Sequence, residues 1–360
     1  MRELICLIGK LFFIGKKQSI DQDNIKNILI IRSGALGDVI MTTPFIRSVR
    51  KNYPHAKISY LVGEWSASVL KNNPFIDEVI TFNDNIINKK RFFGIVTLIK
   101  KVKLKKFDTA FILDKSYLWN LFAFFSGIVY RIGFDRDGEG FPNTINVPFD
   151  GKKYELEYNL DLLKKMRLKI IDTKMELFPS QSDFEKAKEI IRKTKGIVIG
   201  IAPGGAKNPG QEMAEKRWPR EKYLELIKKL TTHKNISIML FGGPTDTDIG
   251  KFIELNTQKK RMINLIGKTN LHQSYLLMKK CKVVITHDSG PLHLAAASGT
   301  KIIALFGPTP PHRFAPKNAM ILYKGTPEKP GYDIYGNVTR KDYMSMIDVE
   351  EVYKKTISLL

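Results

Sequence analysis

Residues 286–309 read THDSGPLHLAAASGTKIIALFGPT and hold the clearest structural pattern in the chain. The apolar run Val283–Ile285 just before them and the run Lys301–Phe306 within them are typical of buried strands. Between the two runs, Pro291 suits the first turn of a helix and Gly299 suits its end. The order of strand, tight turn, short helix and strand predicts a parallel unit.

The start of this short helix is a predicted anion site. The first N–H groups of a helix have no partner inside it, and the helix dipole makes that end positive. Ser289 and Gly290 stand at this point and His293 lies one turn further on, so a phosphate is the expected occupant. Asp288 ends the strand and, when ionised, accepts hydrogen bonds from hydroxyls. Together these groups indicate a nucleotide sugar, and the alternative is a well-capped helix without a ligand.

The stretch DSGPLHLAAASGTKIIALFGPT resembles the donor-site signature of glycosyltransferase family 9, the family of the lipopolysaccharide heptosyltransferases. Three further motifs of that family occur in its order, namely SGALGD at 33–38, KRWP at 216–219 and GGPTD at 242–246. The resemblance covers about Ile28 to Thr309. It implies an α/β fold of the GT-B class, in which two Rossmann-like domains with parallel sheets face a central cleft.

The first of these motifs carries the candidate catalytic residue. Asn27–Ile31 is a predicted buried strand, and a Gly-rich turn leads from it to Asp38 without matching G-x-G-x-x-G. From the residues alone, Asp38 is either a helix cap or a base that takes a proton from a sugar hydroxyl. The resemblance implies the second role, because SGALGD followed by Pro44 is similar to the signature that holds the family's proposed general base.

The resemblance also implies the residues that bind the donor. In KRWP, Lys216 would contact the phosphates, and in GGPTD, Asp246 would contact the ribose hydroxyls. The implied donor-binding residues are Lys216, Asp246, Asp288, Ser289, Gly290 and His293. Two departures leave the sugar open: the loop Lys207–Glu215 is long, and Pro310–Arg313 follows FGPT where many relatives carry an Asp.

Acceptor-binding residues are expected in the first half of the chain. The segment RIGFDRDG at 131–138 resembles the family's RxGFxRDG loop beside the acceptor, and a predicted strand ends at Asp114-Lys115-Ser116. The expected acceptor-binding residues are Ser33, Lys115, Ser116 and Arg131.

Two similar halves predict two domains. A buried strand runs into a Gly-rich turn at 28–38 and again at 197–206. We expect an acceptor-binding domain over 1–178 and a donor-binding domain over 179–340. A terminal helix is expected over 341–360, and the resemblance implies that it packs back on the N-terminal domain.

The composition limits the partners. The 360 residues carry 59 Lys and Arg against 36 Asp and Glu, a net charge of +23, which favours anionic partners. The excess is shared by both halves and no nucleic-acid-binding motif occurs, so we expect no nucleic-acid partner. Cys6 and Cys281 suit a reducing compartment, and neither Cys nor His shows metal-ligand spacing, so neither a metal nor a cofactor is expected.

Two basic segments raise the question of membrane contact. The apolar part of residues 1–20 is too short to span a bilayer. We expect this segment to form either an interfacial helix or a helix packed on the rest of the protein. Residues 89–106, KKRFFGIVTLIKKVKLKK, contain no acid and predict a basic amphipathic helix. Its polar face is either simply solvated, or lies on an anionic membrane or near a phosphorylated acceptor.

We therefore expect a monomeric, metal-independent, inverting glycosyltransferase. By the resemblance it would move heptose from an ADP-sugar to the inner core of lipopolysaccharide, at the cytoplasmic face of the membrane. Three alternatives remain: a family member that uses another nucleotide sugar, a nucleotide-sugar epimerase, and a non-catalytic binder of glycolipid or nucleic acid. The epimerase would need a second carboxylate beside Asp38, and the sequence indicates none.

Overall fold

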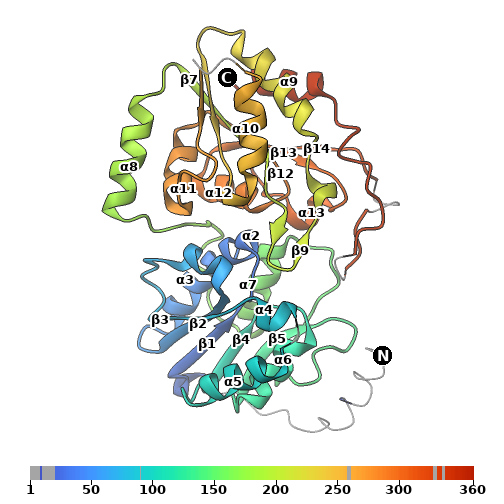
Figure 1. The fold of residues 1–360 in the computed structure, drawn as a ribbon. Coiled ribbons are helices and arrows are strands. Elements are labelled where there is room, and N and C mark those ends of the chain that lie inside the picture. The colour runs from blue at the N-terminus through green and yellow to red at the C-terminus, as the bar shows by residue number, and fades with distance from the viewer. Residues whose placement is uncertain (1–8, 10–20, 90, 258–260, 327–330, 335–336) are drawn as a thin grey trace. The chain divides into compact units, whose positions relative to one another are not determined.

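The computed structural model describes residues 9, 21–89, 91–257, 261–326, 331–334 and 337–360. The helix predicted within residues 1–20 therefore lies outside the described residues, apart from position 9. The chain divides into two compact units, Met1–Lys174 and Met175–Leu360 (Figure 1). The boundary expected from the sequence was at 178.

The first unit is built on a six-stranded parallel sheet in the order β3-β2-β1-β4-β5-β6. This is the Rossmann order, in which the chain reverses direction across the sheet between β1 and β4. The strands are β1 (Asn27–Ile31), β2 (Lys57–Gly63), β3 (Glu78–Phe82), β4 (Thr109–Ile112), β5 (Tyr130–Asp135) and β6 (Ile145–Pro148). The helices are η1 (Gln22–Asn24), α2 (Leu36–Ile40), α3 (Thr43–Asn52), η2 (Glu64–Leu70), α4 (Asn85–Asn88), α5 (Phe92–Lys103), α6 (Tyr117–Phe125) and α7 (Glu155–Lys165).

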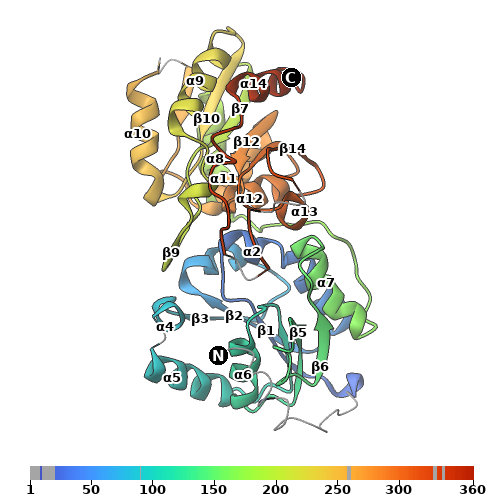
Figure 2. The same ribbon diagram turned by 90° about the vertical axis from the view of Figure 1, so that its right-hand side faces the viewer.

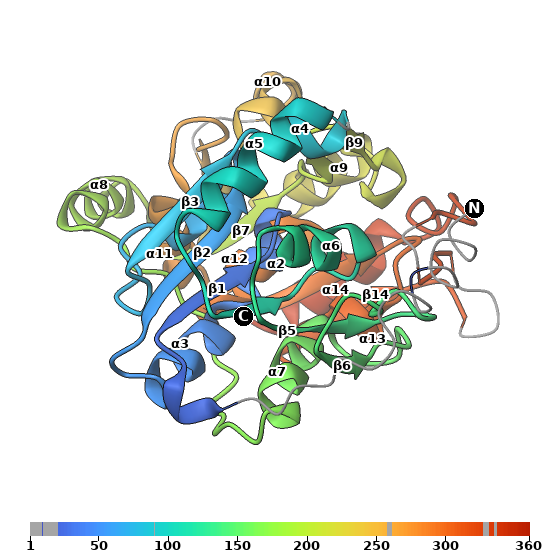
Figure 3. The ribbon, with the colours of Figure 1, turned by 90° about the horizontal axis from the view of Figure 1, so that it is seen from below.

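Helices cover both faces of this sheet because its central strands are apolar on both sides. Ile28 to Ile31 of β1 are all fully buried. Leu29 and Ile31 face α5 and α6, which lie side by side on one face, while α3 and α7 lie on the other (Figure 3). On that second face the rings of Phe45 and Phe111 pack edge to face, with 5.3 Å between their centroids.

The second unit repeats the same sheet. Its order, β11-β10-β7-β12-β13-β14, is again the Rossmann order, and all of these pairs are parallel. The strands are β7 (Ile197–Ala202), β10 (Ile236–Leu240), β11 (Met262–Asn264), β12 (Val283–His287), β13 (Lys301–Phe306) and β14 (Ala319–Tyr323). The helices are α8 (Gln181–Arg192), η3 (Ala214–Lys216), α9 (Arg220–Thr231), η4 (Pro244–Asp246), α10 (Thr247–Leu255), α11 (Leu271–Lys280), α12 (Gly290–Ser298), α13 (Pro311–Phe314) and α14 (Val349–Ile357). The prediction of two Rossmann-like parallel sheets is confirmed.

In this unit α9, α10 and α14 pack over one face of the sheet, and α8, α11 and α12 pack together on the other (Figure 2). The segment that opened the sequence analysis forms β12, α12 and β13 as predicted. Gly299 ends α12 with φ +78°, the left-handed conformation that glycine adopts without strain.

Two segments differ from the sequence-based expectation. The terminal helix is shorter than 341–360, and α14 packs on α9 within the second unit because Val349 and Val352 are buried in that unit's core. Packing of this helix against the N-terminal domain stays a prediction. The long loop 207–215 contains a small antiparallel hairpin of β8 (Lys207–Asn208) and β9 (Gln211–Glu212). Within the described ranges, no helix has the length and the apolar run that crossing a bilayer requires.

Candidate active site

The candidate catalytic residue lies at the carboxyl edge of the first sheet. In open α/β sheets, ligands bind beyond the carboxyl ends of the strands at the point where the strand order reverses. In the first unit that point lies between β1 and β4, which are hydrogen-bonded neighbours. The turn with Asp38 follows β1, and Asp114 to Ser116 follow β4. Topology therefore brings together two segments that are about 80 residues apart in the sequence.

Asp38 is held by an arginine that the sequence analysis did not single out. Nη2 of Arg32 lies 2.7 Å from Oδ1 of Asp38. The other carboxylate oxygen accepts the backbone N–H of Ala35 at 2.9 Å, so Asp38 also caps α2. The Asp38 side chain is still 27% exposed. It therefore combines the two roles that the sequence left as alternatives: it is a helix cap, and it stays reachable for a hydroxyl.

Asp114 is a second carboxylate on the same arginine, which corrects the expectation that Asp38 has none nearby. Its Oδ1 lies 3.6 Å from Nη1 of Arg32. It accepts the backbone N–H of Ser33 at 2.7 Å and the Ser33 hydroxyl at 3.0 Å. Burial raises the pKa of Asp114, and Arg32 and Ser33 offset only part of this rise. The sequence pattern could have indicated both residues, because Arg32 directly precedes SGALGD and Asp114 follows the strand beside β1.

Lys115 forms a buried ion pair next to this cluster. Its Nζ lies 2.7 Å from Oε2 of Glu155 at the start of α7, and over the rings of Phe134 and Phe149. Burial lowers the pKa of Lys115, and Glu155 opposes that effect. Ser116 begins α6 as its N-cap, where its hydroxyl oxygen accepts the N–H of Leu118 at 3.4 Å. Both residues thus have structural partners, and their contact with an acceptor stays a prediction.

Arg131 does not lie at this edge, contrary to expectation. It is the second residue of β5 and pairs with Ala110 near the start of β4, so it lies toward the amino edge of the parallel sheet. Its guanidinium donates to the carbonyls of Ile128, Val129 and Pro142. Arg131 therefore stabilises the turns around β5, and we remove it from the candidate acceptor site.

The second unit has a corresponding site where β7 and β12 are neighbours. Ser289 is the N-cap of α12, and its hydroxyl donates to the carbonyl of His287 at 3.2 Å. The loop after β7 approaches closely: a Cβ at Gly205 would lie 3.0 Å from Oγ of Ser289, and its φ of +100° also favours glycine. Gly290 begins α12, so the positive end of this nine-residue helix points to the space above both loops.

Lys216 and Asp288 meet at this point. Nζ of Lys216 lies 2.8 Å from Oδ2 of Asp288 and 5.6 Å from the ring centroids of both Phe314 and Tyr332. Burial by itself would raise the pKa of Asp288, but the charge and hydrogen bond of Lys216 outweigh it and lower the pKa. Both residues were expected at the donor site from the sequence, whereas their ion pair and the two aromatic neighbours were not.

The carboxylate of Asp246 has two backbone partners. Its Oδ1 accepts the N–H of Gly205 at 2.9 Å, and its Oδ2 accepts the N–H of Gly243 at 2.8 Å. A Cβ at Gly204 would lie 2.5 Å from Oδ1 of Asp246, so the carboxylate fits tightly beneath the loop after β7. Asp246 ties the loops after β7 and β10 together. Contact between Asp246 and a ribose stays a prediction.

Two histidines lie beneath the start of α12. His293 is buried one turn inside that helix, as expected for a residue below the predicted anion site. His287 ends β12, and its Nδ1 lies 3.1 Å from the hydroxyl of Tyr223. Burial lowers the pKa of His287 to about 3, so the imidazole is neutral at pH 7.

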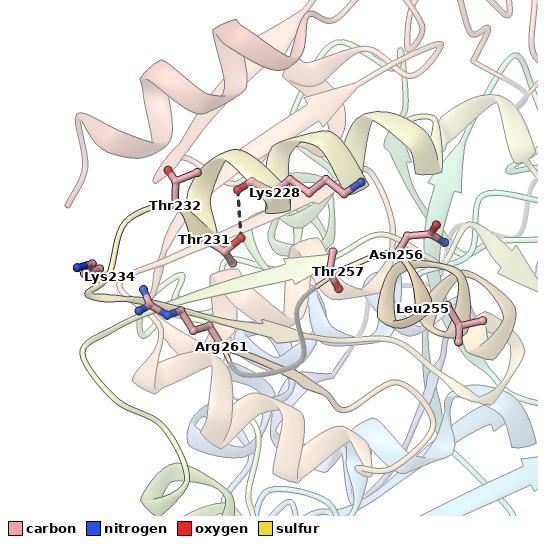
Figure 4. Close-up of a pocket in the computed structure, with 8 residues that line it drawn as sticks. All are labelled: Lys228, Thr231, Thr232, Lys234, Leu255, Asn256, Thr257 and Arg261. Carbon is pink, nitrogen blue, oxygen red and sulfur yellow. Dashed lines mark hydrogen bonds between the residues drawn. The ribbon is translucent and has the colours of Figure 1, made fainter.

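A surface hollow of about 830 Å³ lies elsewhere in the second unit, where α9 and α10 end and lead into the amino ends of β10 and β11 (Figure 4). The lining residues are Lys228, Thr231, Thr232, Lys234, Leu255, Asn256, Thr257 and Arg261. Because it lies at the amino edge of the sheet, it is not part of the candidate site. Among the described residues, no three His, Cys, Asp or Glu side chains are grouped so that they could hold a metal ion.

Comparison with known proteins identifies the family. The family model described as glycosyltransferase family 9 (heptosyltransferase) matches residues 95–332. The chain belongs to this family. Lipopolysaccharide heptosyltransferase 2 of Escherichia coli (strain K12) is 29% identical over 305 residues, which cover 79% of this chain and 83% of that protein.

Solved structures of family 9 proteins share the fold. A family 9 glycosyltransferase from Veillonella parvula superimposes with a TM-score of 0.76 at 25% identity, over 96% of this chain and 99% of that one. Escherichia coli heptosyltransferase WaaC with ADP-2-deoxy-2-fluoro heptose has a TM-score of 0.68 at 18% identity, over 92% and 99%. The predicted GT-B class is thereby confirmed.

Proposed function

We propose that this family 9 glycosyltransferase transfers heptose from ADP-heptose to the inner core of lipopolysaccharide, with inversion at the anomeric carbon. The observation that carries the proposal is the polar cluster at the switch point of each sheet. One cluster offers an accessible carboxylate, and the other offers a cation and a helix N-terminus. The choice of ADP-heptose is supported by the names of the relatives, one of which was solved with a fluorinated ADP-heptose.

The second unit would hold the donor. The diphosphate would lie at the start of α12, where the N–H groups and the positive helix end face it. Lys216 would contact the diphosphate from the neighbouring loop, and Asp288 would accept hydrogen bonds from hydroxyls of the donor. As the bond between the sugar and ADP breaks, negative charge grows on the leaving diphosphate. A fixed cation and oriented N–H groups stabilise that charge.

The first unit would supply the base. Asp38 would take the proton of an acceptor hydroxyl while that oxygen attacks the anomeric carbon from the face opposite ADP. One bond forms as the other breaks, so the configuration inverts and the proton ends on the carboxylate. Arg32 fixes the orientation of this carboxylate through its Oδ1. Ser33, Lys115 and Ser116 stay the proposed acceptor contacts.

The acceptor would be the lipid-linked core at the cytoplasmic face of the membrane, and the protein would act there peripherally. Its net charge of +23 suits an acceptor that carries phosphates and a membrane that carries anionic lipid. We propose a monomer that needs neither a cofactor nor a nucleic-acid partner.

The base assignment is tested with Asp38→Asn. This variant keeps the size of the side chain but cannot accept the proton, so kcat should fall by about 10²- to 10⁴-fold while ADP still binds. Asp248→Asn, at an exposed position in α10, is the control and should leave kcat unchanged. Unchanged turnover in Asp38→Asn would show that another group is the base.

The identity of the donor is tested separately by measuring thermal shifts with ADP-, UDP-, GDP- and CDP-sugars. Stabilisation by ADP-heptose is the expected result. A response only to UDP- or GDP-sugars would replace heptose with another donor, the main alternative left by the unusual residues after FGPT.

A further inference from the structure

The face of α5 that points away from the first sheet combines large apolar side chains with lysines. Residues three or four positions apart lie on the same side of a helix. One side of α5 and its end therefore carries Phe93, Thr97, Lys100, Lys101 and Leu104. Phe93 is 84% exposed and Leu104, directly after the helix, is 82% exposed. We call these five residues the outer stripe of α5.

The packing of α5 fixes the direction of this stripe. Leu98 and Val102, on the opposite side of the helix, are buried in the core under the sheet. The outer stripe consequently faces away from the core, on the side of the unit where α5 and α6 lie next to each other (Figure 3). Phe93 and Leu104 thus give both ends of this face an apolar side chain that is exposed to water.

The segment that contains the stripe carries only positively charged side chains. Residues 89–106 contain eight Lys and Arg and no Asp or Glu. Lys105 is paired with Glu78 on the neighbouring strand β3, whereas Lys100 and Lys101 lie on the stripe itself. Anionic lipid headgroups attract each Lys near the surface, and the acyl boundary accepts Phe and Leu side chains.

The neighbouring helix extends the same surface. Cε of Lys103 would lie 3.8 Å from a Cβ built at Gly127, so the ends of α5 and α6 adjoin. Phe125 at the end of α6 is 57% exposed and Val129 is 47% exposed. The end of α6 therefore adds two exposed apolar side chains near the end of α5.

We propose that the outer stripe of α5 is a docking surface for an anionic phospholipid bilayer, with α5 lying parallel to the membrane plane. Phe93 and Leu104, about 16 Å apart along the helix axis, would insert at the acyl boundary. Lys100 and Lys101 between them would contact phosphate headgroups. A bilayer suits this pattern better than a nucleic acid, which offers the aliphatic Leu104 no apolar environment.

The test is vesicle co-sedimentation of the full chain without donor or acceptor. Vesicles of phosphatidylglycerol and phosphatidylethanolamine should bind the protein, and vesicles of phosphatidylcholine alone should bind it at least about tenfold more weakly. Phe93→Ser with Leu104→Ser should weaken binding by about tenfold or more. Lys100→Gln with Lys101→Gln should weaken it several-fold and reduce its dependence on salt.

Matched controls separate this surface from general charge. Leu255→Ser removes an equally exposed leucine, at 80%, from α10, and Lys279→Gln with Lys280→Gln removes an adjacent lysine pair at the end of α11. Both should bind vesicles like the unaltered chain. All these positions are exposed, so circular dichroism should show unchanged melting.

Three outcomes would overturn the proposal. These are an unaltered chain that does not bind anionic vesicles, stripe variants that bind as well as the unaltered chain, and controls that lose as much binding as the stripe variants. A chain that instead binds single-stranded RNA through Lys100 and Lys101, with no vesicle binding, belongs to the first outcome. Because no sugar transfer is measured, none of these results tests the proposed transfer of heptose. The first outcome would also contradict the proposed peripheral membrane contact, whereas the other two would contradict only the docking surface.

Discussion

Arg32 connects the two carboxylates of the first candidate site, and no other described residue is ion-paired with both. It follows directly after β1, so the backbone of the strand determines where the guanidinium lies. Lys216 has a similar place in the second unit, where it pairs with Asp288. In both units a buried or half-buried cation fixes the orientation of an acidic side chain at the carboxyl edge of the sheet.

Replacing Lys216 by Gln is the first prediction at this scale. The amide still donates a hydrogen bond to Asp288 but has no charge for a diphosphate. A hydrogen bond to a charged group contributes about 1.5–3 kcal/mol, so the affinity for ADP should fall by about 10- to 100-fold in calorimetric titration. Lys251→Gln, at an exposed position in α10, is the control. If the two variants bind ADP equally, Lys216 does not contact the phosphates.

The buried imidazole of His287 predicts a pH dependence of stability. Its pKa is about 3 in the folded chain, against about 6.5 when unfolded. As the pH falls below 6.5, the unfolded state gains a proton that the folded state does not, so the free energy of unfolding decreases. From pH 7 to pH 5 this should amount to about 2 kcal/mol.

Urea unfolding at pH 7 and pH 5 measures this difference in the free energy of unfolding, for the unaltered chain and for two variants. His287→Leu should lose that part of the pH dependence, whatever its stability at pH 7. Tyr223→Phe removes only the hydroxyl near Nδ1 and should keep it. An identical pH dependence in His287→Leu and the unaltered chain would mean that His287 is protonated in the folded state.

At the scale of elements, the C-terminal segment is part of the second core. Ile347 is fully buried, and its carbonyl accepts the indole N–H of Trp218 at 3.1 Å. Ile347→Ala should therefore lower the free energy of unfolding by about 2–5 kcal/mol. Met346 is 50% exposed, so Met346→Ala should change it by less than about 0.5 kcal/mol. Equal effects of the two substitutions in urea unfolding would place this segment outside the core.

The sequence predicted elements well where one local pattern determines them. The apolar runs of β1, β7, β12 and β13 and the Pro and Gly at the ends of α12 sufficed for a correct prediction. Roles that depend on neighbours far along the chain were missed. The motif around Asp246 did not show that its carboxylate accepts backbone N–H groups 3 and 41 residues away. Arg131 looked like an acceptor contact because its position in β5 relative to the sheet edge is not visible in a motif.

At the scale of the whole molecule, the two units repeat one strand order, and each has its polar cluster at the same topological position. The sequence predicted the two sheets from the repeated strand and Gly-rich turn. It could not show that Arg32, Asp38 and Asp114 meet, because that depends on the pairing of β1 with β4.

Hydrogen exchange of the full chain with ADP tests the assignment of the donor to the second unit. Backbone amides within 203–206 and 289–292 should exchange more slowly, because they would border the diphosphate. The exchange rates of amides within 32–38 should not change. Amides within 231–235, at the opposite edge of the second sheet, serve as an internal control. Slower exchange confined to the first unit would reverse the assignment of donor and acceptor.

The ion pair between Lys216 and Asp288 has a consequence for selectivity. The ammonium of Lys216 already has a counter-ion, so a nucleotide that binds as proposed would compete for this ammonium with a carboxylate of charge −1. A diphosphate carries more charge than that carboxylate, whereas a single ionised oxygen on an adenosine derivative does not. Adenosine monophosphate esters and neutral nucleosides should therefore bind poorly at the start of α12. Selectivity among ligands would depend on whether a ligand's charge can replace Asp288 as the partner of Lys216, and not on shape alone.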